Sequence, residues 1–182
     1  PTPSWALAQA GHVVSTRGRN GGTVVVYDPA ERATDDPHRV ARRLGRDEVL
    51  DALALRAVVE PGAAELAAGR ELTADDRDRL TAAHAEYLAA EGPARRVADS
   101  RWHILVAELS GSTSVAAAVA DVQARLDELL AAIPVFGVNI THSVAQHRRV
   151  AQAIVTGDAS AARAAMREHV DGTAALLRGL LA

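Results

Sequence analysis

From position 47 onward the sequence is a succession of six helix-compatible segments separated by short breaks, and this pattern constrains the fold more than any other feature. Each break contains Gly, Pro or an N-capping residue such as Thr73 or Asp158. Connections of two to six residues join antiparallel neighbours, so a helical bundle is expected. The predicted helices cover about 47–69, 74–91, 94–110, 114–133, 140–156 and 159–181.

The composition of the chain agrees with this fold class. Forty of the 182 residues are Ala, all twenty basic residues are Arg, and only 3% are aromatic. This mixture favours helix and excludes an all-β fold, and it leaves the core to Leu, Val and closely approaching helices. Several apolar residues recur at helix-compatible intervals in the first predicted helix: Leu50, Leu53, Ala54, Ala57, Val58, Ala64 and Leu66.

The N-terminal part differs from the rest in both pattern and charge. Residues 12–27 are typical of a β-hairpin, with β-branched runs on either side of a turn that contains Asn20-Gly21. Residues 28–46 are typical of a connecting segment, helical in part around 40–44. Residues 1–46 carry a balance of +3 and residues 47–182 a balance of −6. Arg17 and Arg19 at the hairpin tip could contact DNA, or they could simply solubilise a surface hairpin.

Several classes of protein are excluded or disfavoured by what the sequence lacks. No apolar run approaches the ~18 residues of a membrane-spanning helix, and no secretory signal opens the chain. The absence of Cys excludes disulfides and thiolate metal sites. We therefore expect a cytoplasmic protein with no membrane partner. Because the first residue is Pro, we also expect a fragment or a missing start.

The histidines provide the candidate chemistry. Asp99 and His103 stand four residues apart on one predicted helix, a spacing at which the two side chains can hold one metal ion. His147 and His169 lie in phase with apolar residues on the fifth and sixth predicted helices, so both are expected to point inward. Three imidazoles and a carboxylate could then converge inside the bundle. Taken singly, each His could instead be a hydrogen-bonded core residue, and the Asp99–His103 pair could be exposed.

Four motifs in this order resemble a known family. They are RAVVEP with ELAAGR in the first helix, DSRWH at 99–103 followed by SGS at 110–112, QHRRVAQAIVTGD at 146–158, and AARAAMREHV at 161–170. Together they resemble the FCD effector-binding domain of GntR-type transcription regulators of the FadR subfamily. The stretch LAQAGHVVSTRGRNGGTVVV likewise resembles the end of the recognition helix and the wing of a GntR winged helix. Ser112 and Gln146 depart from the family pattern, where Asn and Glu are usual.

The resemblance implies a metal site and an effector site. It assigns Asp99, His103, His147 and His169 to a divalent cation, with zinc as the first expectation and nickel, manganese or iron as alternatives. It implies a small carboxylate or sugar-acid effector, which Arg56 would contact through its guanidinium. Arg56 could equally form a structural ion pair with Glu60 one turn away.

The resemblance also implies a domain organisation and a function. Residues 1–29 would be a partial winged helix, 30–46 a linker and 47–182 the helical metal- and effector-binding domain. The expected protein is a metabolite-responsive, homodimeric regulator that binds operator DNA. It is not expected to be an enzyme. A helical metalloenzyme of hydrolase type using the same centre is the alternative, and a purely structural bundle is a third possibility. The residues expected to contact DNA are Arg17, Gly18, Arg19, Asn20 and Gly21.

Overall fold

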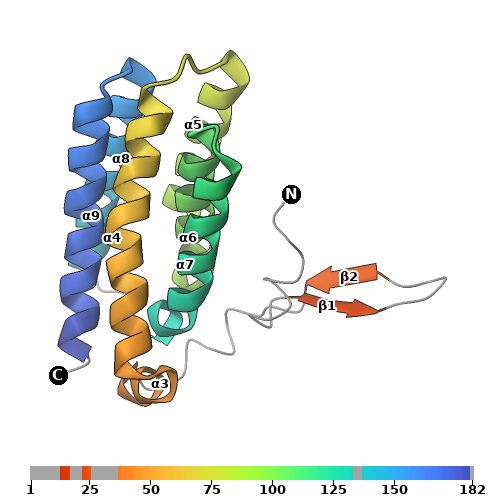
Figure 1. Cartoon of the computed structure of the whole chain (residues 1–182), viewed down its shortest axis with the longest axis vertical. Helices are drawn as coiled ribbons and strands as arrows, with labels where there is room; N and C mark the ends of the chain where they lie inside the picture. Colours follow the sequence, from red (N-terminus) through yellow and green to blue (C-terminus); the bar gives the residue numbers. More distant parts are fainter. Residues whose placement is uncertain (1–12, 17–21, 26–36, 133–136, 181–182) are drawn as a thin grey trace.

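The computed structural model describes residues 13–16, 22–25, 37–132 and 137–180 (Figure 1). These residues form two short strands and seven helices. The strands are β1 (Val13–Thr16) and β2 (Gly22–Val25). The helices are α3 (Pro37–Leu44), α4 (Arg46–Ala68), α5 (Ala74–Ala89), α6 (Gly92–Leu109), α7 (Thr113–Ala132), α8 (Gly137–Thr156) and α9 (Ala159–Leu180).

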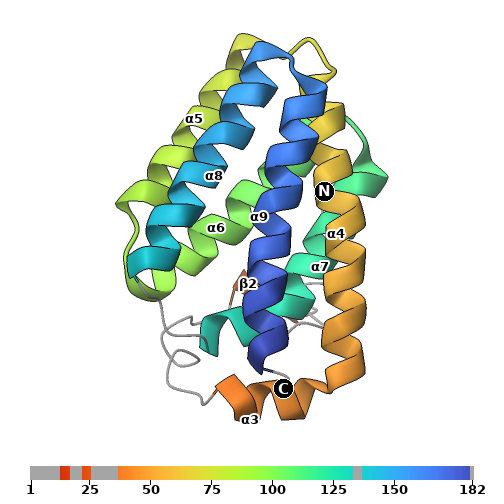
Figure 2. The same cartoon turned by 90° about the vertical axis from the view of Figure 1, so that its left-hand side faces the viewer.

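The six long helices form an antiparallel bundle. Successive helices from α4 to α9 run in alternating directions (Figure 2). Helix α4 packs against α9, α7, α6 and α8, while α8 packs against α9 and α5 against α6. The short helix α3 lies across one end of the bundle, where it contacts α4, α7 and α9. The prediction of a mainly helical bundle is therefore confirmed.

The N-terminal strands pair with each other. β1 and β2 are antiparallel, with Val13 opposite Val25 and Thr16 opposite Gly22. The five residues expected to contact DNA, 17–21, lie outside the described part of the chain. The assignment of this pair of strands to a wing therefore stays a prediction.

Side-chain caps explain where two of the helices begin. At the start of α5, Thr73 Oγ1 accepts a hydrogen bond from the Asp76 amide, and Asp76 Oδ2 accepts one from the Thr73 amide, both at 3.1 Å. At the start of α9, Asp158 Oδ1 accepts from the Ala161 amide at 2.9 Å. Gly157, with φ of 77°, adopts the left-handed conformation that glycine tolerates and ends α8. The predicted capping roles of Thr73 and Asp158 agree with these bonds.

The core corrects part of the sequence interpretation. Val58 and Leu66 on α4 are exposed, at 69% and 49%, although the apolar pattern of α4 included them. The buried residues of α4, a helix that packs against α9 and α7, are instead mostly small Ala residues with two charged ones, Arg56 and Glu60. On α9, Leu177 is buried, whereas its neighbour Leu176 is exposed.

Within the described ranges, no helix combines the length and apolar character needed to cross a membrane.

Candidate metal centre

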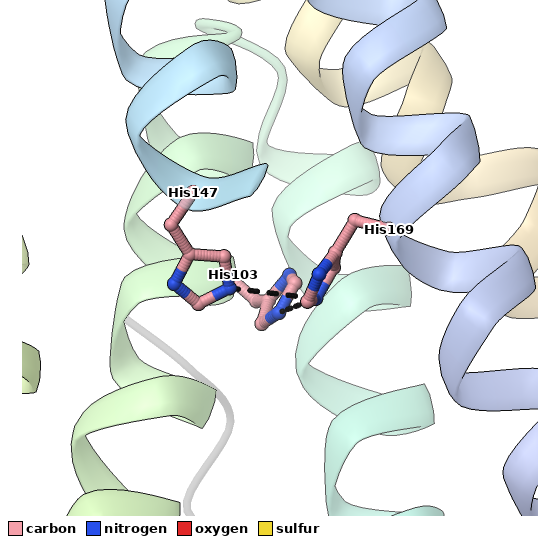
Figure 3. A group of neighbouring side chains, drawn as sticks. All are labelled: His103, His147 and His169. Carbon is pink, nitrogen blue, oxygen red and sulfur yellow. Dashed lines mark hydrogen bonds between the residues drawn. The ribbon is translucent and has the colours of Figure 1, made fainter. Parts of the chain in front are cut away.

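Three histidines from three helices meet inside the bundle (Figure 3). His169 Nε2 lies 3.1 Å from His103 Nε2 and 3.4 Å from His147 Nε2. All three side chains are buried. Helices α6, α8 and α9 thus bring together positions that are 22 to 66 residues apart in sequence.

The local sequence explains why these side chains face inward. On α8, Val150 and Ile154 are buried one and two turns beyond His147. On α9, Ala162 and Met166 are buried on the side that carries His169. Burial of these apolar stripes orients both helices, and each His occupies a position in its stripe.

Oxygen atoms lie beside Nδ1 of two of the histidines. His103 Nδ1 lies 2.9 Å from Glu60 Oε2 without a hydrogen bond between them, and His169 Nδ1 is hydrogen-bonded to Gln146 Oε1 at 3.1 Å. An amide oxygen can only accept, so Gln146 assigns the hydrogen of His169 to Nδ1. The Nε2 atom of His169 then presents a lone pair toward His103 and His147.

The arrangement fits a divalent cation. Metal–nitrogen bonds of about 2.0–2.1 Å place neighbouring ligand atoms about 3.0–3.4 Å apart, the range of the two separations from His169 Nε2. Two imidazole nitrogens at 3.1 Å share either a hydrogen or another electrophilic atom between them, and a metal ion can take that place. Ligating histidines also commonly donate their other nitrogen to a carboxylate or carbonyl oxygen, as His169 does to Gln146 here.

Asp99 lies beside the three histidines. Its Oδ1 is 3.5 Å from His147 Nε2 and its Oδ2 is 3.9 Å from His103 Nε2. The Asp99 side chain is 17% exposed, whereas those of His103 and His147 are 0% exposed. The cluster therefore adjoins solvent on the Asp99 side.

A buried polar network supports the cluster from α4 and α7. Arg56 Nε donates to Glu60 Oε1 at 2.8 Å, and Gln123 Nε2 donates to the same oxygen at 2.7 Å. Arg56 Nη2 also lies 3.3 Å from His103 Nε2. Burial by itself would raise the pKa of Glu60, but the charges of Arg56 and His103 and their hydrogen bonds hold it well below its ordinary value. Glu60 is therefore a carboxylate.

Arg56 forms the predicted ion pair with Glu60, and its contact with an effector stays a prediction. Its guanidinium also reaches the histidine cluster. Among the described residues, Arg56 Nη1 has no hydrogen-bond partner although it is buried. A buried guanidinium N–H without an acceptor is costly, so this atom marks a position where an anionic ligand would be stabilised.

Burial also tunes the histidines toward metal binding. The pKa of His147 is well below its ordinary value, chiefly because of burial and then because of His169 and His103. The pKa of His169 is lowered well below its ordinary value by burial, by His103 and by Arg56. Both rings are neutral at pH 7, which is the state in which an imidazole ligates a metal.

Sequence reasoning missed four residues of this centre. Gln123 and Gln146 supply hydrogen bonds to Glu60 and His169. Trp102 stacks on His147 with ring centroids 3.9 Å apart, and the Tyr87 ring lies 4.7 Å from the same imidazole. Trp102 directly precedes His103 on α6, so its proximity to His103 could be predicted from sequence. Its contact with His147 on α8 could not.

A comparison with family models identifies the fold. The model of the FCD domain matches residues 51–172. The chain belongs to the FCD domain family. This confirms the FCD resemblance, without specifying the FadR subfamily.

A solved structure shares the FCD fold. The chain is similar to "Streptococcus agalactiae GntR", with 22% sequence identity and a TM-score of 0.60 over 96% of this chain and 78% of that one. No curated protein matches the sequence. The FCD match includes the four residues of the predicted ligand set and Arg56, and it excludes β1 and β2.

Proposed function

We propose that this FCD domain binds a divalent metal ion together with a small organic acid, and that it is the sensing part of a transcription regulator. FCD membership supports the regulator. Convergence of three buried histidine nitrogens, with the His169 lone pair fixed by Gln146, carries the metal proposal. The expected ligands are His103, His147, His169 and Asp99.

The ligand set does not select one metal by itself. Three imidazoles and one carboxylate suit zinc first, and also nickel, manganese or iron. The ion would supply an electrophilic centre for a carboxylate oxygen of the effector. This chain would supply the second anchor, the Arg56 guanidinium, whose buried Nη1 has no acceptor among the described residues.

The DNA-binding part of the proposal rests on the N-terminal region. The similarity to a GntR protein supports a GntR-type regulator, whose N-terminal part would be a winged helix. Residues 1–29 would then form part of that domain and 30–46 the linker, with the 17–21 segment approaching operator DNA. In a cytoplasmic homodimer, effector binding in the 47–182 domain would shift the populations that fit two operator half-sites.

A metalloenzyme is the less favoured alternative. The carboxylate that contacts the histidines besides Asp99 is Glu60, whose Oε1 accepts from Arg56 and Gln123 and whose Oε2 lies 2.9 Å from His103. Glu108 is exposed and paired with Arg79 on the surface. These contacts leave neither carboxylate free to act as a general base.

Metal analysis of the purified protein tests the centre. Wild type is expected to hold one equivalent of a divalent metal, and His147→Ala is expected to lose it. His142→Ala is the matched control, because His142 is exposed on the same helix. A His147→Ala variant that retains a full equivalent would overturn the ligand assignment.

A thermal-shift screen tests the effector. A mono- or dicarboxylate or a sugar acid is expected to raise the melting temperature of the metal-loaded wild type and to lose this effect in Arg56→Met. If no such acid shifts the wild type, the effector proposal is wrong while the metal centre stands.

A further inference from the structure

The three imidazoles differ in what holds their rings. His169 Nδ1 is hydrogen-bonded to Gln146 Oε1 at 3.1 Å, and His103 Nδ1 lies 2.9 Å from the Glu60 carboxylate without a hydrogen bond. His147 Nδ1 is buried and has no hydrogen-bond partner among the described residues. A hydrogen bond at Nδ1 is the usual device that fixes the plane of a ligating imidazole, and His147 lacks it.

Trp102 packs against the face of the His147 ring, where it can restrict rotation of the imidazole. Its indole is fully buried and stacks on the His147 ring, with centroids 3.9 Å apart and planes inclined by only 13°. Rotation of the imidazole about its Cβ–Cγ bond would drive the ring edge into the indole. Tyr87 adds a tilted contact at 4.7 Å.

We propose that Trp102 is the positioning residue of His147: the stacked indole holds the imidazole plane so that Nε2 faces His103 and His169. The inference rests on the proposed metal centre and assigns Trp102 a role besides its apolar packing. The indole also meets the His103 ring edge-on at 5.1 Å, so one side chain orients residues of two helices, α6 and α8.

Two substitutions separate stacking from volume. Trp102→Phe keeps a flat ring over the imidazole, whereas Trp102→Met keeps an apolar side chain without a flat face. The matched control is Leu109→Ala, which removes a buried side chain from the same helix and the same part of the core without touching the histidines. All variants are compared by far-UV circular dichroism before metal is added.

Affinity and the ligand field of bound Co²⁺ are the readouts. Trp102→Met is expected to bind Co²⁺ about 10- to 100-fold more weakly, as for loss of other outer-shell partners, with a changed visible absorption spectrum. Trp102→Phe is expected to stay close to wild type in both. Leu109→Ala is expected to melt at a lower temperature yet keep the wild-type affinity and spectrum.

Each outcome decides a separate point. If wild type binds no Co²⁺, the metal centre itself is wrong and the positioning role falls with it. If wild type binds but Trp102→Met matches it in affinity and spectrum, only the positioning role is wrong. The positioning role is equally wrong if Leu109→Ala loses as much affinity as Trp102→Met.

Should Trp102→Met fail to fold, NMR of the metal-free wild type tests the proposal instead. The ring protons of His147 are expected to be shifted upfield by the stacked indole, and ordinary chemical shifts would overturn the proposal.

Discussion

At the scale of single residues, the ion pair between Arg56 and Glu60 is costly to bury. Both side chains are almost completely buried; Gln123 also donates to the Glu60 carboxylate, and His103 lies 2.9 Å from it. A buried pair of this kind contributes little net stability, but removing one partner leaves an uncompensated charge. Its position beside the histidines favours a role in binding over a role in stability.

Glu60→Ala is accordingly expected to lower the free energy of unfolding by about 3–5 kcal/mol, because Arg56 is left buried and unpaired. The double variant Arg56→Met with Glu60→Leu is expected to recover most of this loss while failing to respond to the effector. Urea-induced unfolding measures both. Glu168→Ala, which breaks the exposed pair with Arg149, serves as the control and should have a much smaller effect. Equal losses in the single and double variants would argue against this account.

The histidines make the stability of the metal-free protein depend on pH. The pKa values of His147 and His169 lie below their ordinary value of 6.5 in the folded state. Between the folded pKa and 6.5 the unfolded chain binds more protons, so stability is complete above 6.5 and decreases as the pH falls. The melting temperature of metal-free protein is expected to drop from about pH 7.5 to about pH 5.5. The slope should shrink in a His147→Gln, His169→Gln double variant, and a flat profile for wild type would contradict the assignment.

The candidate ligands were partly predictable at this scale, and their supporting residues were not. Asp99 and His103 share a helix, so their spacing alone brings them near each other. His147 and His169 fall in apolar stripes that predict an inward direction. Gln123 carries no such pattern, and its contact with Glu60 depends on how α7 packs against α4, which local sequence does not specify.

At the scale of helices, the short side-chain caps determine where the elements begin. Thr73 and Asp76 form a reciprocal pair of hydrogen bonds at the start of α5. Such caps act through neighbouring residues only, which is why the start of this helix could be predicted from sequence. The exposed face of α4 could not, because Val58 and Leu66 have the same apolar character as the residues that α7 and α9 cover.

Thr73→Ala is expected to lower the free energy of unfolding by about 1 kcal/mol, since the capping box at the start of α5 is lost. Thr81→Ala is the matched control on the same helix. Thr81 donates its hydroxyl to the Arg77 carbonyl in the helix interior, where Ala is the better helix former. Chemical denaturation measures the free energy of unfolding of both variants. An equal decrease in the two would show that the capping box does not stabilise the protein.

At the scale of the whole molecule, the candidate centre links α6, α8 and α9 at one point, while Glu60 and Gln123 connect that point to α4 and α7. A ligand bound there interacts with the native arrangement of five helices. Family membership and motif order made this architecture predictable from sequence. How closely the histidines meet depends on packing between helices distant in the chain.

A saturating divalent metal should therefore stabilise the entire bundle. At a free concentration about 100 times the dissociation constant, the gain is about 2.7 kcal/mol, or a rise in melting temperature of about 5–10 °C for a chain of this size. Chelation should reverse it. Differential scanning calorimetry with added Zn²⁺ and then EDTA measures the shift, with His142→Ala responding like wild type and His147→Ala not responding. A wild-type melting temperature indifferent to both reagents would contradict the metal centre.

The separation of the three histidines along the chain also sets the order of events during synthesis. A nascent chain that has released α6 and α8 from the ribosome but not yet α9 holds two of the three imidazoles, and the third arrives 22 residues after His147. The cluster closes only when α9 docks against α4 and α8. The complete ligand set is thus expected only after α9 has docked, so that a molecule holding the ion by all three imidazoles has α9 in place.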